Sequence, residues 1–129
     1  MTQNALWQLF RSRYGLVAPP RFALQSYRSD SEQDGQLRLT ASILTEGGTR
    51  QLDGQGNGLL SAAVNGLSRW INAPFAIKDY HEHTLGERSD SRSVAYIRCL
   101  FQDGSSRWGV GIDSDVARAS LQALLNAVG

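Results

Sequence analysis

The sequence predicts an α+β fold in which two strand–strand–strand–helix (βββα) modules follow an N-terminal linking helix. Three features of the 129-residue chain lead to this prediction. Each half contains short runs in which apolar and polar residues alternate, which is the period of a β-strand. Each half also ends in a stretch whose apolar residues recur at helical spacing. A Gly-x-Gly pattern precedes both stretches, at Gly54–Gly56 and again at Gly109–Gly111. We therefore expect an internal repeat in which each helix packs on a small antiparallel sheet.

Residues 1–20 are predicted to form the linking helix and an extended connector. Asn4 can cap this helix, Gly15 can end it, and Pro19–Pro20 cannot continue it. Module one then spans residues 21–73. Its predicted elements are strands over 22–28, 37–43 and 49–52, a glycine-rich loop over 54–58, and a helix capped by Asn57.

Module two spans residues 74–129 and repeats the pattern. Its predicted elements are strands over 75–83, 94–101 and 107–112, a polar loop over 84–90, and a last helix capped by Asp113. If the two Gly-x-Gly patterns are matched, the two helices match only after a shift of two residues. The two modules must bury their apolar faces against each other or against a second chain.

Composition narrows the class of protein. Thirteen basic and twelve acidic side chains give a net charge of +1, and neither sign is concentrated in one half. Nucleic acid and anionic membrane are therefore poor partners. The single cysteine, Cys99, excludes a disulfide framework and suits the cytoplasm. No membrane span or signal peptide is expected.

The segment Gly54–Gly58 is the most informative local pattern. A glycine-rich turn directly before a helix exposes unpaired N–H groups at the positive end of the helix dipole, where a phosphate or a carboxylate can bind. The alternative is a plain turn followed by an N-cap. His81-Glu82-His83 could place two imidazoles on one strand face, but with no third ligand nearby we favour a polar strand end and predict no metal site.

No catalytic set of nucleophile, base and orienting group is apparent in the sequence. Cys99 lies between apolar residues, where a small buried side chain is expected rather than a thiolate. Asp79 and Tyr80 fall on opposite faces of their strand unless a β-bulge re-aims one of them. Asp79 could receive an ammonium group or pair with an arginine.

Five ordered segments carry a resemblance to a known family. They are Leu52–Gly58, Asp79–His83, Ala95–Arg98, Trp108–Ile112 and Ala119–Leu124. Together they resemble the C-terminal regulatory (allosteric, dimerisation) domain of 2-isopropylmalate synthase, from about Leu6 to Val128. The resemblance implies that residues 1–129 form one regulatory domain, not itself an enzyme. It also implies a homodimer that binds L-leucine as the effector of feedback inhibition.

The resemblance further implies an N-terminal catalytic domain that condenses acetyl-CoA with 2-oxoisovalerate in leucine biosynthesis. That domain is expected to use a divalent metal, whereas no cofactor is expected in this one. The effector-binding positions carried over from the family are Gly56, Asn57, Gly58, Leu60, Ile77, Asp79, Tyr80, Thr84, Ser91, Ser93 and Ile112. The chain departs from the family at Leu59, where proline is usual, and at Thr84, Ser91 and Ser93, where alanine is common.

Two alternatives to a leucine sensor stay open. An isoleucine-sensing domain of a citramalate synthase would differ in its ligand by the placement of one methyl group, a difference that sequence inspection does not resolve. A dimerisation module with no effector would have the same fold.

Overall fold

The structure is a computed structural model that describes residues 21–32, 34–85 and 91–129. The predicted linking helix and connector lie outside these residues, as does most of the predicted polar loop over 84–90. Eight elements occur in the described part of the chain. They are β1 (Ala23–Ser31), β2 (Leu37–Thr45), β3 (Gly48–Gly56), α2 (Leu59–Trp70), β4 (Phe75–Leu85), β5 (Arg92–Phe101), β6 (Ser106–Asp113) and α3 (Val116–Val128).

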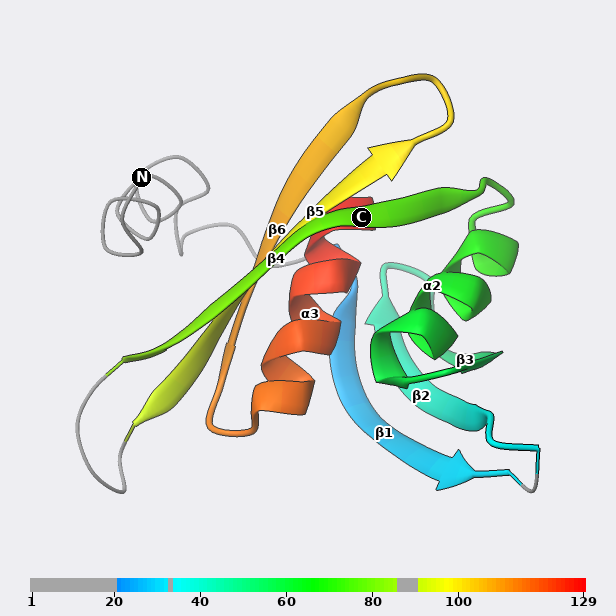
Figure 1. Ribbon diagram of the computed structural model, residues 1–129, viewed down its shortest axis with the longest axis horizontal. Helices are drawn as coiled ribbons and strands as arrows, with labels where there is room; N and C mark the ends of the chain where they lie inside the picture. The colour runs from blue at the N-terminus through cyan, green and yellow to red at the C-terminus, as the bar shows by residue number, and fades with distance from the viewer. Residues whose placement is uncertain (1–20, 33, 86–90) are drawn as a thin grey trace.

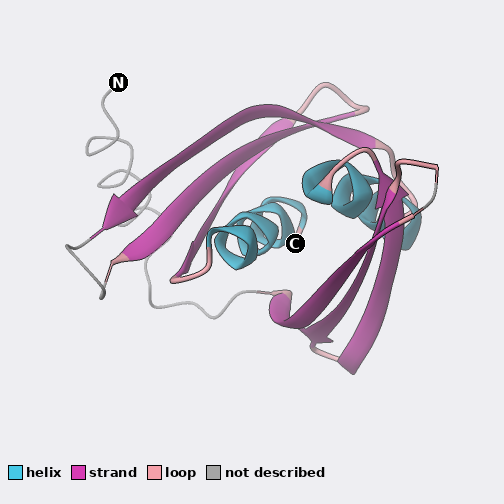
Figure 2. Ribbon diagram, turned by 60° about the horizontal axis from the view of Figure 1, so that its bottom comes forward, coloured by secondary structure: helices cyan, strands magenta, loops and turns pink. Residues whose placement is uncertain are grey.

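The predicted fold class is confirmed. Strands β1, β2 and β3 form one antiparallel sheet in chain order, strands β4, β5 and β6 form the other, and a helix follows each sheet. Both helices lie between the two sheets (Figures 1 and 2). Neither described helix is long and apolar enough to cross a membrane.

The two helices are buried to different extents. Helix α3 packs on β5 and β6 and also contacts β1, so it lies between the sheets in the middle of the molecule (Figure 1). Eight of its thirteen residues are buried, against four of twelve in α2. Leu121, Leu124 and Leu125 of α3 join Leu39 and Ile43 of β2 in one core. The two modules therefore share a single hydrophobic core.

The segment predicted as a glycine loop is mostly strand, and this corrects the sequence prediction. Strand β3 continues through Gly56. Helix α2 packs so close to β3 that a Cβ has no room at Gly54 or Gly56. A Cβ on Gly56 would lie 2.7 Å from the Ala62 nitrogen, and one on Gly54 would overlap the Ala62 carbonyl oxygen. A Cβ on Gly111 of β6 would overlap the Ala119 carbonyl oxygen of α3 in the same way.

Both predicted helix caps are one or two residues away from the actual ones. The N-cap of α2 is Gly58, which has no side chain to offer, while Asn57 accepts a hydrogen bond from Gln36 Nε2 at 3.0 Å. The N-cap of α3 is Asp115, whose carboxylate accepts from the Ala117 amide at 2.9 Å. Asp113 instead accepts from the Asp115 amide at 3.0 Å.

The internal repeat is closer than the sequence match indicated. One offset of 57 positions relates the helices, their caps and the strand glycines that they cover, so Gly54 matches Gly111 and not Gly109. Polar contacts follow the same offset, because Arg69 donates to the Asp53 carbonyl and Asn126 donates to the Val110 carbonyl.

The first strands of the modules repeat with an offset of 53 positions. Each contains a β-bulge, at Gln25 in β1 and at Lys78 in β4. Each bulge is followed two residues later by a tyrosine, Tyr27 or Tyr80. A bulge re-aims the residues after it, and here it turns both tyrosines toward the helices.

Candidate functional site

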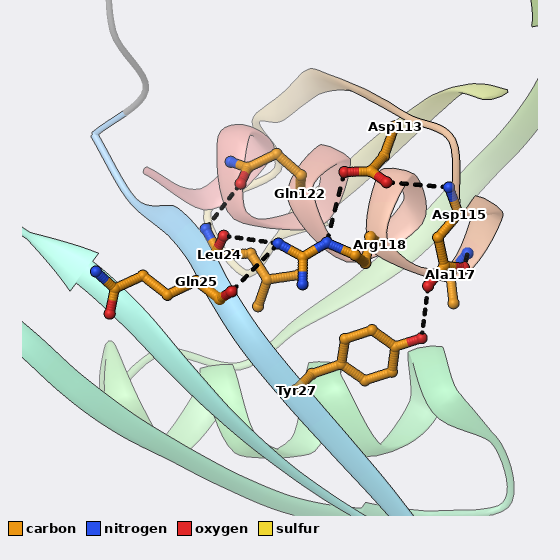
Figure 3. Close-up of polar contacts among 8 residues, drawn as sticks. All are labelled: Leu24, Gln25, Tyr27, Asp113, Asp115, Ala117, Arg118 and Gln122. Atoms are coloured by element: carbon orange, nitrogen blue, oxygen red, sulfur yellow. Dashed lines mark hydrogen bonds and ion pairs between the residues drawn. The ribbon is translucent and has the colours of Figure 1, made fainter. Parts of the chain in front are cut away.

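In the described part of the chain, three main contacts between elements join the modules: β1 with α3, α2 with α3, and α2 with β4. The first of them is tied by a dense set of polar contacts. We call the contact of strand β1 with helix α3 the latched junction (Figure 3). Arg118 of α3 donates from Nη2 to the carbonyls of Leu24 and Gln25, at 3.2 and 3.3 Å. Its Nε lies 3.5 Å from Asp113 Oδ2. One guanidinium thus connects strand β1 to the end of strand β6.

Gln122, one helical turn after Arg118, binds the edge of β1 through both ends of its amide. Its Oε1 accepts from the Leu24 amide at 2.8 Å, and its Nε2 donates to the Phe22 carbonyl at 2.8 Å. An adjacent strand would use these same two backbone groups. Since β1 is an edge strand of its sheet, Gln122 satisfies backbone groups that would otherwise stay open to other strands.

A carboxylate completes the latched junction at the start of α3. The Tyr27 hydroxyl donates to Asp115 Oδ2 at 3.0 Å, while Oδ1 of the same carboxylate caps the helix at the Ala117 amide. The pKa of Tyr27 is raised by burial and by its hydrogen bond to this carboxylate. Asp115 therefore holds a tyrosine of module one and a helix of module two together.

The contact of helix α2 with strand β4 has no such ties among the described residues, and we call it the open junction. The α2 residues that match Asp115, Arg118 and Gln122 at the offset of 57 are Gly58, Ser61 and Asn65. Gly58 has no side chain, and Ser61 is exposed. The Asn65 amide donates to the Gln55 carbonyl of its own module at 2.6 Å.

The start of α2 is accessible to a ligand anion. Gly58 is extended, with a φ of −157°, and a Cβ built on it would have open space around it. Among the described residues, no side chain caps this helix. The Leu60 amide occupies the position that the Ala117 amide occupies in α3, where the carboxylate of Asp115 binds. The uncapped N–H groups and the helix dipole favour a negative charge here.

Tyr80 lies on the inner face of β4 and is 38% exposed. Its hydroxyl donates to Glu82 Oε2 at 2.8 Å and lies 2.7 Å from the hydroxyl of Ser120, which is 4% exposed. Because the Tyr80 proton points to Glu82, Ser120 donates to Tyr80. Burial and the contact with Glu82 raise the pKa of Tyr80, against the lowering effect of the Ser120 hydrogen bond.

Asp79 and Ile112 lie on the opposite face of the second sheet from Tyr80. Asp79 forms an ion pair with Arg98. Ile112 packs with the fully buried Val94 and Tyr96. Asp79 and Tyr80 thus keep the opposite faces that strand alternation predicts, and the bulge at Lys78 places Ile77 on the face of Tyr80.

The two histidines share that outer face with Asp79. His81 stacks on Trp108, with ring centroids 6.3 Å apart, and His83 lies beside Tyr96. Burial lowers the pKa of His83. No group of three or more His, Cys, Asp or Glu side chains that could hold a metal ion occurs within residues 21–32, 34–85 and 91–129.

The remaining predicted site residues lie on α2, on β4, and on or directly before β5. Leu60 and Ile77 are half-buried and pack against the shared core. Thr84 pairs with Ser93 across β4 and β5, and Ser91 directly precedes β5. The Tyr80 hydroxyl bonds to Ser120 and Glu82, and the Asn57 side chain bonds to Gln36. These bonds therefore do not connect the predicted residues at the start of α2 with those of β4.

Sequence reasoning missed Ser120 and the latch residues Arg118, Gln122 and Asp115. A signal for the repeat was available, since Ala23-Leu24-Gln25-Ser26-Tyr27 and Ala76-Ile77-Lys78-Asp79-Tyr80 align without gaps. That alignment pairs the tyrosines and points to the helix residues near them.

Comparison with known proteins assigns the family. The sequence model of the family described as the LeuA allosteric (dimerisation) domain matches residues 1–129. The chain belongs to the LeuA allosteric (dimerisation) domain family. It is 40% identical over 124 residues to a 2-isopropylmalate synthase from Marinomonas sp. and 38% identical over 128 residues to one from Rhodospirillum rubrum. A 2-isopropylmalate synthase from Schizosaccharomyces pombe is 33% identical over 126 residues.

These matches cover most of the chain and a minor part of each relative. They include 95%, 98% and 93% of this LeuA domain, but only 22%, 23% and 21% of the respective relatives. The chain thus spans about a fifth of the length of these synthases, and the resemblance noted in the sequence is confirmed.

Proposed function

We propose that this LeuA domain binds L-leucine at the open junction and acts as the feedback-inhibition and dimerisation domain of a 2-isopropylmalate synthase. Its catalytic partner would be an N-terminal domain of the same polypeptide, which uses a divalent metal to condense acetyl-CoA with 2-oxoisovalerate. The family assignment supports this role, because the relatives that the chain matches are 2-isopropylmalate synthases.

The observation that carries the proposal is the carboxylate of Asp115. In module two this side chain caps the helix and receives a tyrosine hydroxyl. In module one the matching helix start, at Gly58, has no carboxylate, and the matching tyrosine is Tyr80. The carboxylate of a free amino acid would supply the missing group, held by the amides around Gly56, Asn57 and Gly58.

The rest of the ligand would use residues of both elements at this junction. Half-buried apolar side chains near the shared core, Leu60 and Ile77, supply the walls of an aliphatic slot, with the ring of Tyr80 as a third. Glu82 beside the Tyr80 hydroxyl supplies a negative charge for an ammonium group. The roles of Asp79, Thr84, Ser91, Ser93 and Ile112 are proposed from the family resemblance, and Asp79 and Ile112 would act from the other face of the sheet.

Feedback control requires leucine to bind one arrangement of the domain better than another, since a ligand with equal affinity for both shifts nothing. The open junction is suited to such control because it has no polar ties of its own among the described residues. Contacts with the ligand would then stabilise only the arrangement in which the ligand binds.

Calorimetric titration of the chain with leucine, isoleucine and valine tests the proposal. We expect saturable heat with leucine at one site per chain, and a rise in melting temperature. Leucine at 100 times its Kd should raise the unfolding free energy by about 2.7 kcal/mol. Tighter binding of isoleucine would favour the citramalate synthase alternative. If none of the three amino acids gives heat or a melting shift at millimolar concentration, the remaining alternative is a dimerisation module without an effector.

A further inference from the structure

We propose that Arg118 and Gln122 are positioning residues: through the latched junction they hold the two modules in the one relative arrangement in which the open junction can bind its ligand. The second half of this inference rests on the proposed function, whereas the first half stands on the contacts alone.

The hydrogen bonds of the latched junction join elements that are far apart in the sequence. Gln122 and Arg118 lie 93 to 100 positions after the β1 groups that they bind. All of these bonds run from helix side chains to the backbone of β1 or of Phe22, which directly precedes it. Hydrogen bonds constrain direction as well as distance. Figure 3 shows the side chains of α3 arrayed along β1. They therefore define where β1, and with it the first sheet, lies relative to α3.

Apolar packing alone would leave this relation less defined. The leucines of α3 meet an inner sheet face built of aliphatic side chains, and such surfaces can slide with a small loss of contact. Directional hydrogen bonds remove that freedom. The Asp113–Arg118 contact extends the control to the second sheet, because Asp113 ends β6.

The open junction depends on the same relation. Helix α2 is packed on β3 of the first sheet, and β4 belongs to the second sheet. Any rotation of one module against the other changes how helix α2 lies on strand β4. With no side-chain ties of the latch type at Ser61 and Asn65, this junction relies on the latched one for its geometry.

The repeat supplies a matched control. Asn65 and Arg69 of α2 also donate to strand carbonyls, those of Gln55 and Asp53, at 2.6 and 2.7 Å. Both bonds stay within module one. The double variant Arg118→Met/Gln122→Met removes one guanidinium and one amide from the latched junction. The variant Asn65→Met/Arg69→Met removes the same groups from bonds that stay within module one. Gln122→Met alone serves as a milder variant if the double variant folds poorly.

Residual dipolar couplings measured by NMR test the first half. In the unsubstituted chain and in the Asn65→Met/Arg69→Met variant, couplings from both modules should fit one alignment tensor. In the latch variants the two modules should need separate tensors. A single tensor in the latch variants, including Gln122→Met, would overturn the inference.

Leucine titration of the same folded variants tests the second half. In the latch variants, only the fraction of molecules with the binding-competent arrangement of the modules can bind leucine. The Kd should therefore rise several-fold in these variants and stay unchanged in the control. Separate tensors with an unchanged Kd would overturn the positioning role. Absence of leucine binding in the unsubstituted chain would defeat the proposed function, and the tensors would still decide whether the latch exists.

Discussion

The latched and the open junction each join the helix of one module to the first strand of the other, yet only the latched one is tied by hydrogen bonds between the described residues. At the latched junction Asp115, Arg118 and Gln122 bind Tyr27 and the backbone of β1. At the open junction the matching residues are Gly58, Ser61 and Asn65, which are shorter. The repeat thus ties one interface with side chains and leaves the matching positions of the other without them.

The modules also differ in the outer faces of their sheets. The central strands β2 and β5 match with an offset of 56 positions, because Leu39 pairs with Gly54 and Ala95 pairs with the matching Gly111. This offset relates Thr40 to Tyr96 and Arg38 to Val94. Tyr96 and Val94 are fully buried, while Arg38 is exposed and pairs with Asp53. The outer face of the second sheet therefore carries an apolar cluster around Val94 and Tyr96, beside the Asp79–Arg98 pair, where the matching positions of the first sheet are polar.

The largest expected effect tests how closely each helix approaches its strand. Gly111→Ala would drive a methyl group into the Ala119 carbonyl, and Gly54→Ala would do the same at Ala62. Each should lower the unfolding free energy by about 3 kcal/mol, measured by urea denaturation. Gly58→Ala has open space and an ordinary φ, and should stay within about 0.5 kcal/mol of the parent chain. Equal losses at Gly58 and Gly111 would refute this packing.

Buried acids of module two make stability fall at alkaline pH. Burial raises the pKa of Cys99 to about 11 and that of Tyr96 to about 12, from ordinary values of 9.0 and 10.0. From pH 9 upward the unfolded chain loses protons that the folded chain still holds, so the unfolding free energy decreases as pH rises. Each pKa unit corresponds to about 1.4 kcal/mol.

Cys99→Ala separates the two groups, because it removes the thiol and leaves Tyr96. Its unfolding free energy should fall less steeply between pH 9 and 11 than that of the parent chain, as followed by denaturation at each pH. The module-one residue at the matching position is Ile43, which does not titrate. An identical slope in both chains would show that the Cys99 thiol does not contribute.

A smaller effect is expected from the carboxylate of the latched junction. Asp115→Ala removes the cap of α3 and the acceptor of Tyr27, and should cost about 1–2 kcal/mol. Tyr27→Phe should cost less than about 1 kcal/mol in the parent chain and nothing in the Asp115→Ala background. Additive losses in this cycle, measured by thermal or urea unfolding, would mean that the two side chains do not interact.

The fold could be predicted from the sequence because its signals are local. Strand alternation, helical stripes and the glycines under each helix identify two βββα modules. The end of β3 was misplaced because Gly54 and Gly56 look like turn residues, whereas their requirement comes from a helix that passes within contact distance of the strand. Such a close approach is a tertiary fact that the local sequence does not contain.

The candidate site was harder to predict than the fold. The segments around Gly58 and Tyr80 were identified through a family resemblance, and the bulge at Lys78 then decided which face each strand residue occupies. Arg118 and Gln122 were missed, since an arginine and a glutamine on a helix usually face solvent. Their function depends on a strand about 95 positions away in the chain.

Replacing the proposed ligand carboxylate with one from the protein tests the central claim most directly. Gly58→Asp would give α2 the cap that Asp115 gives α3, and should raise the unfolding free energy by about 1 kcal/mol. In calorimetry this more stable variant should no longer bind leucine, while Gly58→Ala should bind like the parent chain. Undiminished leucine binding by a folded Gly58→Asp variant would contradict the account.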